Sequence, residues 1–205
     1  MDDQELTPLK KSRRYGFANK AGKEVIPCTW REVKFFHEGR AAVKDDNGRW
    51  GFIDMAGNLV IPCQWSWVRK FSEGLAIIKD NNGKRGYIDK TGKMVIPCQW
   101  EGAWLFYEDK IALVKGDNGL FGFIDQTGHL ICDCKWTEAW DFSEGRAFVK
   151  DDQNKWGYID TTGNLVIPCQ WHSGGDFIDG VAHVEDNDGK WFIIDKTGKI
   201  LREKY

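Results

Sequence analysis

Apolar and polar residues alternate along this chain in short runs of six or seven residues, such as 59–65 (LVIPCQW) and 74–80 (GLAIIKD). Side chains of a β-strand point to opposite faces in turn, so alternation with a period of two indicates strands. No segment has the spacing of an amphipathic helix. The pattern therefore predicts an all-β chain.

Turn signals rich in glycine separate these runs. The runs 74–80 and 84–89 flank Asp-Asn-Asn-Gly, a strong hairpin signal because Asn and Gly accept positive φ. A second turn, Asp-x-Thr-Gly, leads into a third strand of the type LVIPCQW. Proline recurs inside that strand and has no N–H for a sheet, which places the strand at a sheet edge or at a bulge. These prolines are Pro27, Pro62, Pro97 and Pro168.

The third strand also carries a recurrent cysteine. Alternation predicts that Leu59, Ile61, Cys63 and Trp65 share one face, which we expect to be core. The cysteines of this position lie a whole repeat apart rather than at the C-x₂-C spacing of metal sites, so we expect small buried thiols and no metal. They are Cys28, Cys63, Cys98, Cys134 and Cys169.

The whole pattern recurs about every 35 residues, at Gly16, Gly51, Gly86, Gly122 and Gly157, with Phe192 at the sixth place. Such a period is typical of solenoids and propellers. We therefore predict six three-stranded units, which together make a single repeat domain over 1–205. The expected units are a degenerate first unit 5–38, then 39–73, 74–108, 109–144, 145–179 and a last unit 180–205.

Two arrangements of six such units are open. A closed, propeller-like toroid protects the edges of its sheets, whereas an open superhelical β-solenoid needs polar caps at both ends. Charged residues at both ends of the chain are compatible with caps. We favour the closed toroid and keep the open solenoid as the alternative.

The repeated pattern (W/F/R)-G-(F/Y)-I-D-x-x-G-x-(L/V)-V-I-P-x-x-W, followed by F-x-E-G-x-A-x-V, resembles the bacterial WG-repeat family from Tyr15 to about Leu201. The resemblance implies a β-rich array that serves binding or scaffolding, and it supplies no catalytic residue. The chain departs from the pattern at Arg85 and Phe121 in place of Trp, at Phe192 in place of Gly, and at Cys132-Asp133 in place of Ile-Pro.

Composition narrows the possible functions. With 29 Lys and Arg against 31 Asp and Glu, the formal charge of −2 gives no whole-chain case for binding nucleic acid or a membrane surface. The basic run 10–14 (KKSRR) is expected to be a solvated loop. The N-terminus lacks the apolar core of a signal peptide and no run is long enough to span a membrane. We therefore expect a cytoplasmic protein with reduced cysteines.

Candidate chemistry is sparse. His37, His129, His172 and His183 occupy four different repeat positions, and the usual nucleotide and hydrolase motifs are missing. The acidic turns at 45–48 and 186–189 lack the first oxygen ligand of a calcium loop. The recurrent Asp54 and its equivalents are expected to cap turns. We predict no catalytic residue, no metal and no cofactor, and hence no enzyme.

One segment of each unit varies freely, and it contains three of the 11 tryptophans. These variable segments are 31–35, 66–70, 101–105, 137–141 and 172–176. Varied positions of repeat arrays often lie on the binding face. We predict a protein-binding surface, with a glycan as the alternative ligand; packing between units is the competing interpretation of the tryptophans. The candidate residues are Lys34, Phe35, Trp67, Arg69, Lys70, Trp104, Leu105, Trp140 and Asp141.

Overall fold

The computed structural model describes residues 6–107 and 109–204, which form β-strands and turns and contain no helix. The all-β prediction is confirmed. No helix in the described ranges could therefore cross a membrane. Residues 5, 108 and 205, which bound three of the predicted units, lie outside the described residues.

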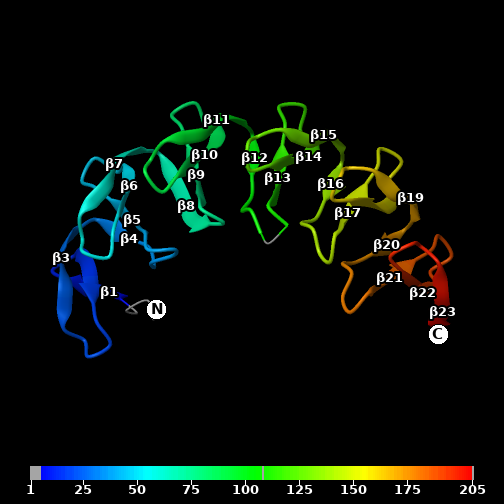
Figure 1. Ribbon diagram of the computed structural model, residues 1–205, viewed down its shortest axis with the longest axis horizontal. Coiled ribbons are helices and arrows are strands. Elements are labelled where there is room, and N and C mark those ends of the chain that lie inside the picture. Colours follow the sequence, from blue (N-terminus) through cyan, green and yellow to red (C-terminus); the bar gives the residue numbers. More distant parts are fainter. Residues whose placement is uncertain (1–5, 108, 205) are drawn as a thin grey trace. The chain divides into compact units, whose positions relative to one another are not determined.

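The chain divides into two compact units, Met1–Gln99 and Trp100–Tyr205. The first unit contains three antiparallel sheets, seen at the blue to green end of the ribbon in Figure 1. Its strands are β1 (Thr7–Lys11), β2 (Arg14–Ala18), β3 (Glu24–Trp30), β4 (Glu32–Val33), β5 (Ala41–Lys44), β6 (Trp50–Ile53), β7 (Leu59–Trp65), β8 (Trp67–Ser72), β9 (Leu75–Lys79), β10 (Arg85–Asp89) and β11 (Met94–Trp100).

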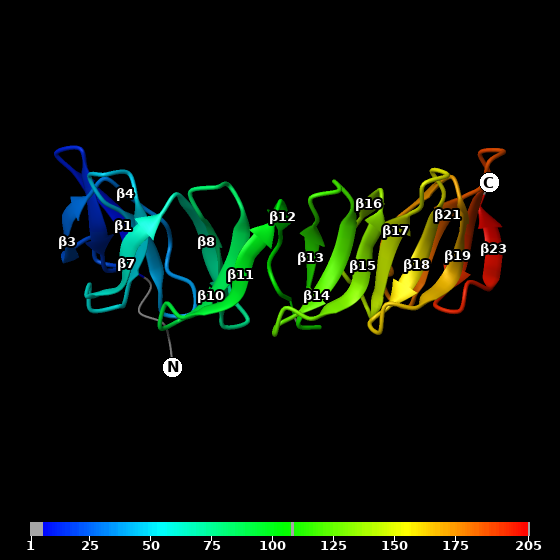
Figure 2. The same ribbon diagram turned by 90° about the horizontal axis from the view of Figure 1, so that it is seen from above.

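The second unit also contains three antiparallel sheets, which follow one another in chain order in Figures 1 and 2. Its strands are β12 (Gly102–Ala103), β13 (Ile111–Lys115), β14 (Phe121–Asp125), β15 (Leu130–Trp136), β16 (Glu138–Ala139), β17 (Arg146–Lys150), β18 (Trp156–Asp160), β19 (Leu165–Trp171), β20 (Ser173–Gly174), β21 (Val181–Glu185), β22 (Trp191–Asp195) and β23 (Ile200–Lys204).

Every sheet is a simple meander, but the prediction of six three-stranded units was wrong. Within residues 6–107 and 109–204, only the sheet β1-β2-β3 has three strands, and the other five have four, in orders such as β4-β5-β6-β7. The additional strand is the variable segment near the end of one predicted unit, which pairs with the first strand of the next predicted unit. It escaped prediction because β4, β12, β16 and β20 are two residues long and show no alternation.

The proline strand lies at a sheet edge, as predicted, in β3, β7, β11 and β19. Beside Gly51 the strand β7 bulges, because Trp50 pairs with Trp65 while Phe52 pairs with Ile61. A Cβ on Gly51 would lie 2.4 Å from the carbonyl oxygen of Ile61. The recurrent glycine is therefore required by the close approach of the bulged strand.

Because of the bulge, the prediction that Leu59, Ile61, Cys63 and Trp65 share one core face of β7 was wrong. Ile61 is buried between β4-β5-β6-β7 and the following sheet, whereas Cys63 packs against the cluster shared with the preceding sheet. Leu59, expected in the core, is 48% exposed. Extra residues in a bulge break the strict alternation of a strand, so Ile61 and Cys63 face opposite sides.

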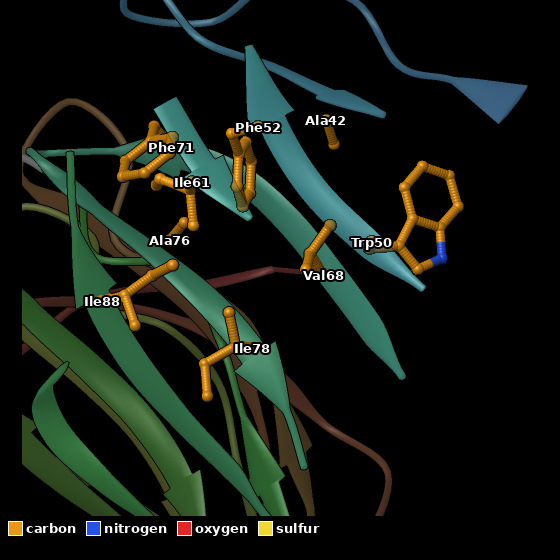
Figure 3. Packing of buried hydrophobic residues seen from close by; sticks show 9 residues of the cluster. All are labelled: Ala42, Trp50, Phe52, Ile61, Val68, Phe71, Ala76, Ile78 and Ile88. Carbon is orange, nitrogen blue, oxygen red and sulfur yellow. The ribbon is translucent and has the colours of Figure 1, made fainter. Parts of the chain in front are cut away.

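The core lies between neighbouring sheets of each unit. Between the second and third sheets of the first unit, Phe52 meets Phe71 edge-on, with ring centroids 4.9 Å apart. Figure 3 shows these rings together with Ile61 and Ala76, contributed by both sheets. The central strands β9 and β13 are buried on both faces, which explains why they are almost continuously apolar.

A recurrent glutamate links neighbouring sheets. In the first unit the Glu38 carboxylate accepts a hydrogen bond from the Gly74 N–H at 3.0 Å and pairs with Lys90 at 3.0 Å. In the second unit Glu144 accepts from the Gly180 N–H at 2.9 Å and pairs with Lys196 at 3.1 Å. The glutamate of F-x-E-G therefore binds the equivalent turn of the next sheet.

The recurrent aspartates cap turns, as expected. One oxygen of Asp54 accepts hydrogen bonds from the backbone N–H groups of Ala56 (3.0 Å) and Asn58 (2.9 Å). Hydrogen bonds from the Asn58 side chain and these backbone groups hold the pKa of Asp54 below its ordinary value of 3.8. The same carboxylate pattern recurs at Asp89, Asp125, Asp160 and Asp195.

Candidate functional site

The variable segments lie along one edge of each four-stranded sheet. Beyond the paired residues of β4 and β16, the backbone N–H of Lys34 donates to Ala42 at 2.9 Å and that of Trp140 donates to Phe148 at 2.9 Å. Side chains of these segments therefore project from a short edge strand whose backbone pairs on one side only. Backbone pairing therefore fixes where these side chains lie, without restricting which residue type occupies each position.

A row of directly opposed residues crosses each sheet next to the hairpin turn. In the sheet β4-β5-β6-β7 the row runs Glu32, Lys44, Trp50 and Trp65. Directly opposed residues of an antiparallel sheet share a face, so these side chains are neighbours. Glu32 pairs with Lys44 at 2.8 Å, and the Lys44 ammonium lies 5.3 Å from the centre of the Trp50 ring. The row therefore places two charged residues beside two tryptophans.

In the next sheet the same row exchanges the places of tryptophan and charge. Trp67 stands where the preceding sheet has Glu32, and Arg85 stands where it has Trp50. The Arg85 guanidinium lies over the Trp67 ring, with its central carbon 5.7 Å from the ring centre. Trp67 is half-buried. It thus supplies the ring that the departure at Arg85 removes from the row.

Trp104 lies beside Phe121, where the repeat has a phenyl ring in place of the larger indole. The ring centroids of Trp104 and Phe121 lie 5.7 Å apart, and a Cβ added to Gly102 would lie 2.8 Å from the Trp104 ring. Trp104 is half-buried against the core of its unit. The next residue, Leu105, is only 4% exposed and therefore belongs to the core rather than to a binding surface.

Trp140 is different, because its sheet already has a tryptophan in the row. Trp156 stacks on Phe148 with centroids 4.2 Å apart, and Trp140 meets the edge of this pair at 6.5 Å from Phe148. Trp140 remains 50% exposed. Unlike Trp67 and Trp104, it belongs to a sheet whose row keeps the repeat tryptophan.

Lys34 lies between two tryptophans of the first unit. Its ammonium is 4.9 Å from the centre of the Trp50 ring and 5.4 Å from that of Trp67, and it donates to the Val68 carbonyl at 2.7 Å. Burial lowers the pKa of Lys34, and the positive charge of Arg69 lowers it further. The Lys34 ammonium reaches the residue next to Arg69, although Lys34 and Arg69 belong to neighbouring sheets.

The remaining candidates are exposed or border a hollow. Phe35 is 62% exposed, and Arg69 and Lys70 are exposed. Asp141 lines a hollow of about 530 Å³ in the second unit, together with Tyr107. The candidates are divided between the two compact units. The first group, in the first unit, is Lys34, Phe35, Trp67, Arg69 and Lys70, and the second group, in the second unit, is Trp104, Leu105, Trp140 and Asp141.

Sequence reasoning missed Lys44 and Arg85 as members of the first group. Lys44 lies over Trp50, and Arg85 lies over Trp67. The signal was present in Arg85, a cation at a position where other repeats have an aromatic ring. Its meaning depends on Trp67 lying in the same row on the other side of Lys79, which only strand pairing reveals.

Possible metal ligands and thiols are the last side chains to consider. The described residues contain no group of three or more His, Cys, Asp or Glu side chains placed to hold a metal ion. The six cysteines are free thiols. Burial raises the pKa of Cys63, Cys98 and Cys169 to about 11, so these thiols are protonated at neutral pH.

Comparison with known proteins identifies the repeat. The sequence profile of the family described as WG containing repeat matches five segments, 15–48, 50–84, 86–119, 121–155 and 156–191. No curated protein matches the chain.

Three solved structures resemble the chain at low identity. The computationally designed Ika8 protein is 13% identical, with 97% of this chain and 74% of that chain covered and a TM-score of 0.47. BamB from Moraxella catarrhalis is 12% identical, with 99% and 74% covered and a TM-score of 0.47. The WD40 beta propeller domain of Doa1 is 9% identical, with 98% and 79% covered and a TM-score of 0.41.

Proposed function

The chain belongs to the WG containing repeat family, and on that premise we propose that it is a non-catalytic module that binds another protein through its variable segments. The observation that carries the proposal is the exposure of large and charged side chains at positions the repeat leaves free. Phe35 is 62% exposed and Trp140 is 50% exposed. Arg69 and Lys70 are also exposed.

These residues have no evident task in the fold. The repeat positions already account for the core between sheets, the glycine beneath each bulge and the capped turns. Exposed aromatic and arginine side chains are the usual anchors of protein interfaces. The proposed surface does not include Trp67, Trp104 and Leu105. Trp67 and Trp104 pack against Arg85 and Phe121, where the repeat lacks its tryptophan, and Leu105 is buried.

Affinity capture from a lysate of the source organism tests the proposal. The test variant is Phe35→Ala/Arg69→Ala/Trp140→Ala, and the matched control is Leu59→Ala/Met94→Ala/Leu165→Ala. The control residues are exposed apolar side chains of the outer strands. We expect the test variant to lose partners that wild type and control retain. The same partners on all three proteins would refute the proposed surface.

The glycan alternative is not carried forward. It depended on several equivalent exposed tryptophans, whereas Trp67 and Trp104 are half-buried beside Arg85 and Phe121. A cytoplasmic location remains part of the proposal, supported by six free cysteines. The closed toroid and the bounds of the repeat units stay predictions.

A further inference from the structure

The net charge of the whole chain is close to zero, but the charged residues are distributed unevenly along it. Residues 1–99 contain 18 Lys and Arg against 12 Asp and Glu, whereas residues 100–205 contain 11 against 19. The first unit thus carries a formal charge of +6 and the second −8. A net charge of this size steers partners of the opposite sign.

Part of the positive charge is concentrated in two neighbouring variable segments of the first unit. Lys34 and Arg69 occupy the same repeat position in adjacent sheets, and Lys70 follows Arg69. The Lys34 ammonium donates a hydrogen bond at 2.7 Å to the carbonyl of Val68, the residue before Arg69, so the two segments meet. We call Lys34, Arg69 and Lys70 the basic patch.

The acidic side chains around the basic patch are already engaged. Glu32 pairs with Lys44 at 2.8 Å, and Glu38 pairs with Lys90 at 3.0 Å. Among the described residues, Arg69 and Lys70 have no ion-pair partner. Like charges that are held close without counter-charges favour a ligand that supplies carboxylates.

An exposed apolar side chain accompanies the charges. Phe35 follows Lys34 and is 62% exposed. Its repeat position in the next sheet is filled by Lys70. A ligand that bridges the two sheets would therefore meet an aromatic ring beside several cations, the combination typical of a peptide-binding surface.

We propose that the basic patch and Phe35 form a docking surface for an acidic segment of another protein. The proposal rests on the proposed function and names the chemistry of its partner. Carboxylates of the segment pair with Arg69 and Lys70, and an apolar residue of the segment packs on Phe35.

A nucleic acid fits these residues less well. Single strands bind by stacking successive bases on several exposed aromatic faces. Here Phe35 offers one such face, whereas Lys34 lies over Trp50 and Trp67 and Arg85 lies over Trp67. A long polyanion would also be repelled by the charge of −8 on residues 100–205. A short acidic segment avoids both difficulties.

Fluorescence anisotropy of a labelled peptide of ten glutamates tests the proposal on the full chain. The test variant is Arg69→Glu/Lys70→Glu. The control, Lys23→Glu/Lys93→Glu, makes the same charge change at exposed turn positions, which hold Asn58 and Asn164 in other repeats. Circular dichroism and thermal unfolding check that each variant is folded, and Arg69→Gln/Lys70→Gln replaces the reversal if it is not.

We expect wild type to bind the peptide and the test variant to bind it at least about tenfold more weakly. The control should change the affinity less than about twofold. Binding should weaken between about 0.1 M and 1 M salt, because screening shortens from about 10 Å to about 3 Å.

Three results would overturn the proposal: no binding by wild type at the lower salt, equal loss in test and control variants, or tighter binding of a twenty-nucleotide single-stranded DNA than of the peptide. If any of these occurs while capture still depends on Phe35, Arg69 and Trp140, only the acidic-segment proposal fails. If that dependence is missing too, the proposed function fails with it.

Discussion

The ring of Trp104 lies 5.7 Å from the ring of Phe121 and is inclined to it by 51°. Phe121 is one of three places where a repeat lacks its expected tryptophan, the others being Tyr15 and Arg85, and Trp104 is one of three tryptophans that the repeat does not account for. Their contact joins the two irregularities. The smaller ring on one strand is compensated by an indole that follows the strand two places away in the sheet.

Trp104→Ala is expected to lower the free energy of unfolding by about 2–3 kcal/mol, because it empties part of a packed core. Trp140→Ala is expected to cost less than about 1 kcal/mol, since half of that side chain is exposed. Urea denaturation of both variants measures the difference. Equal losses would contradict the distinction between the two tryptophans.

Phe121→Trp is expected to restore stability in the Trp104→Ala background and to destabilise the wild type by about 1–3 kcal/mol through overpacking. A double-mutant cycle between the two positions measures this coupling. Additive effects would mean that Trp104 and Phe121 do not compensate for one another.

Gly86→Ala is expected to cost at least about 2 kcal/mol, because the added Cβ would lie 2.5 Å from the Ile96 carbonyl oxygen. Gly175→Ala serves as the control, since its Cβ would meet no heavy atom within 4 Å. Thermal and urea unfolding should leave the control within about 1 kcal/mol of wild type. A tolerated Gly86→Ala would show that the bulge relaxes without cost.

The last repeat supports the link between glycine and bulge. Phe192 replaces glycine there, and its partner strand β23 has no proline. Phe192 pairs directly with Glu203, without the register shift found beside Gly51. A side chain is therefore accepted where the outer strand runs regularly.

The sequence predicted what depends on local pattern: the strands, the capped turns such as that of Asp54, and the edge position of the Pro62 strand. It did not predict β4, because two residues carry no alternation and their pairing depends on distant Ala41–Lys44. It also placed Cys63 on the wrong face, because a bulge cannot be read from alternation. The role of Trp67 depends on Arg85, which lies two strands away in the sheet and 18 residues away in sequence.

Alkylation by iodoacetamide at pH 8 is expected to be slow at Cys63, Cys98 and Cys169. Burial raises the pKa of these thiols to about 11 from 9.0, which lowers the reactive thiolate roughly a hundredfold. Mass spectrometry of native and guanidinium-unfolded protein compares the rates at each cysteine. Equal rates in the two states would contradict the protected position of these thiols.

Asp176 is expected to weaken the fold once it ionises. Burial raises its pKa above the ordinary 3.8, and its Oδ1 is buried without a hydrogen-bond donor among the described residues. The native state therefore holds this proton more tightly than the unfolded state, and the contribution of Asp176 to stability falls as pH rises from 3.8 through the raised pKa.

Asp176→Asn should remove that contribution, so that the variant gains stability over wild type as the pH rises to 7. The exposed Asp188→Asn on a neighbouring turn is the control and should show no such gain. Unfolding midpoints of wild type and both variants between pH 3 and 7 decide the matter. A constant difference between wild type and Asp176→Asn across this range would contradict the assignment.

Hydroxyl-radical footprinting of the protein, alone and bound to a partner captured from lysate, tests most directly whether the variable segments bind. Oxidation of Phe35 and Trp140 should fall in the complex, while oxidation of the outer-strand residues Leu59 and Leu165 should not change. Unchanged oxidation of Phe35 and Trp140, with protection of the outer strands instead, would contradict binding through the variable segments.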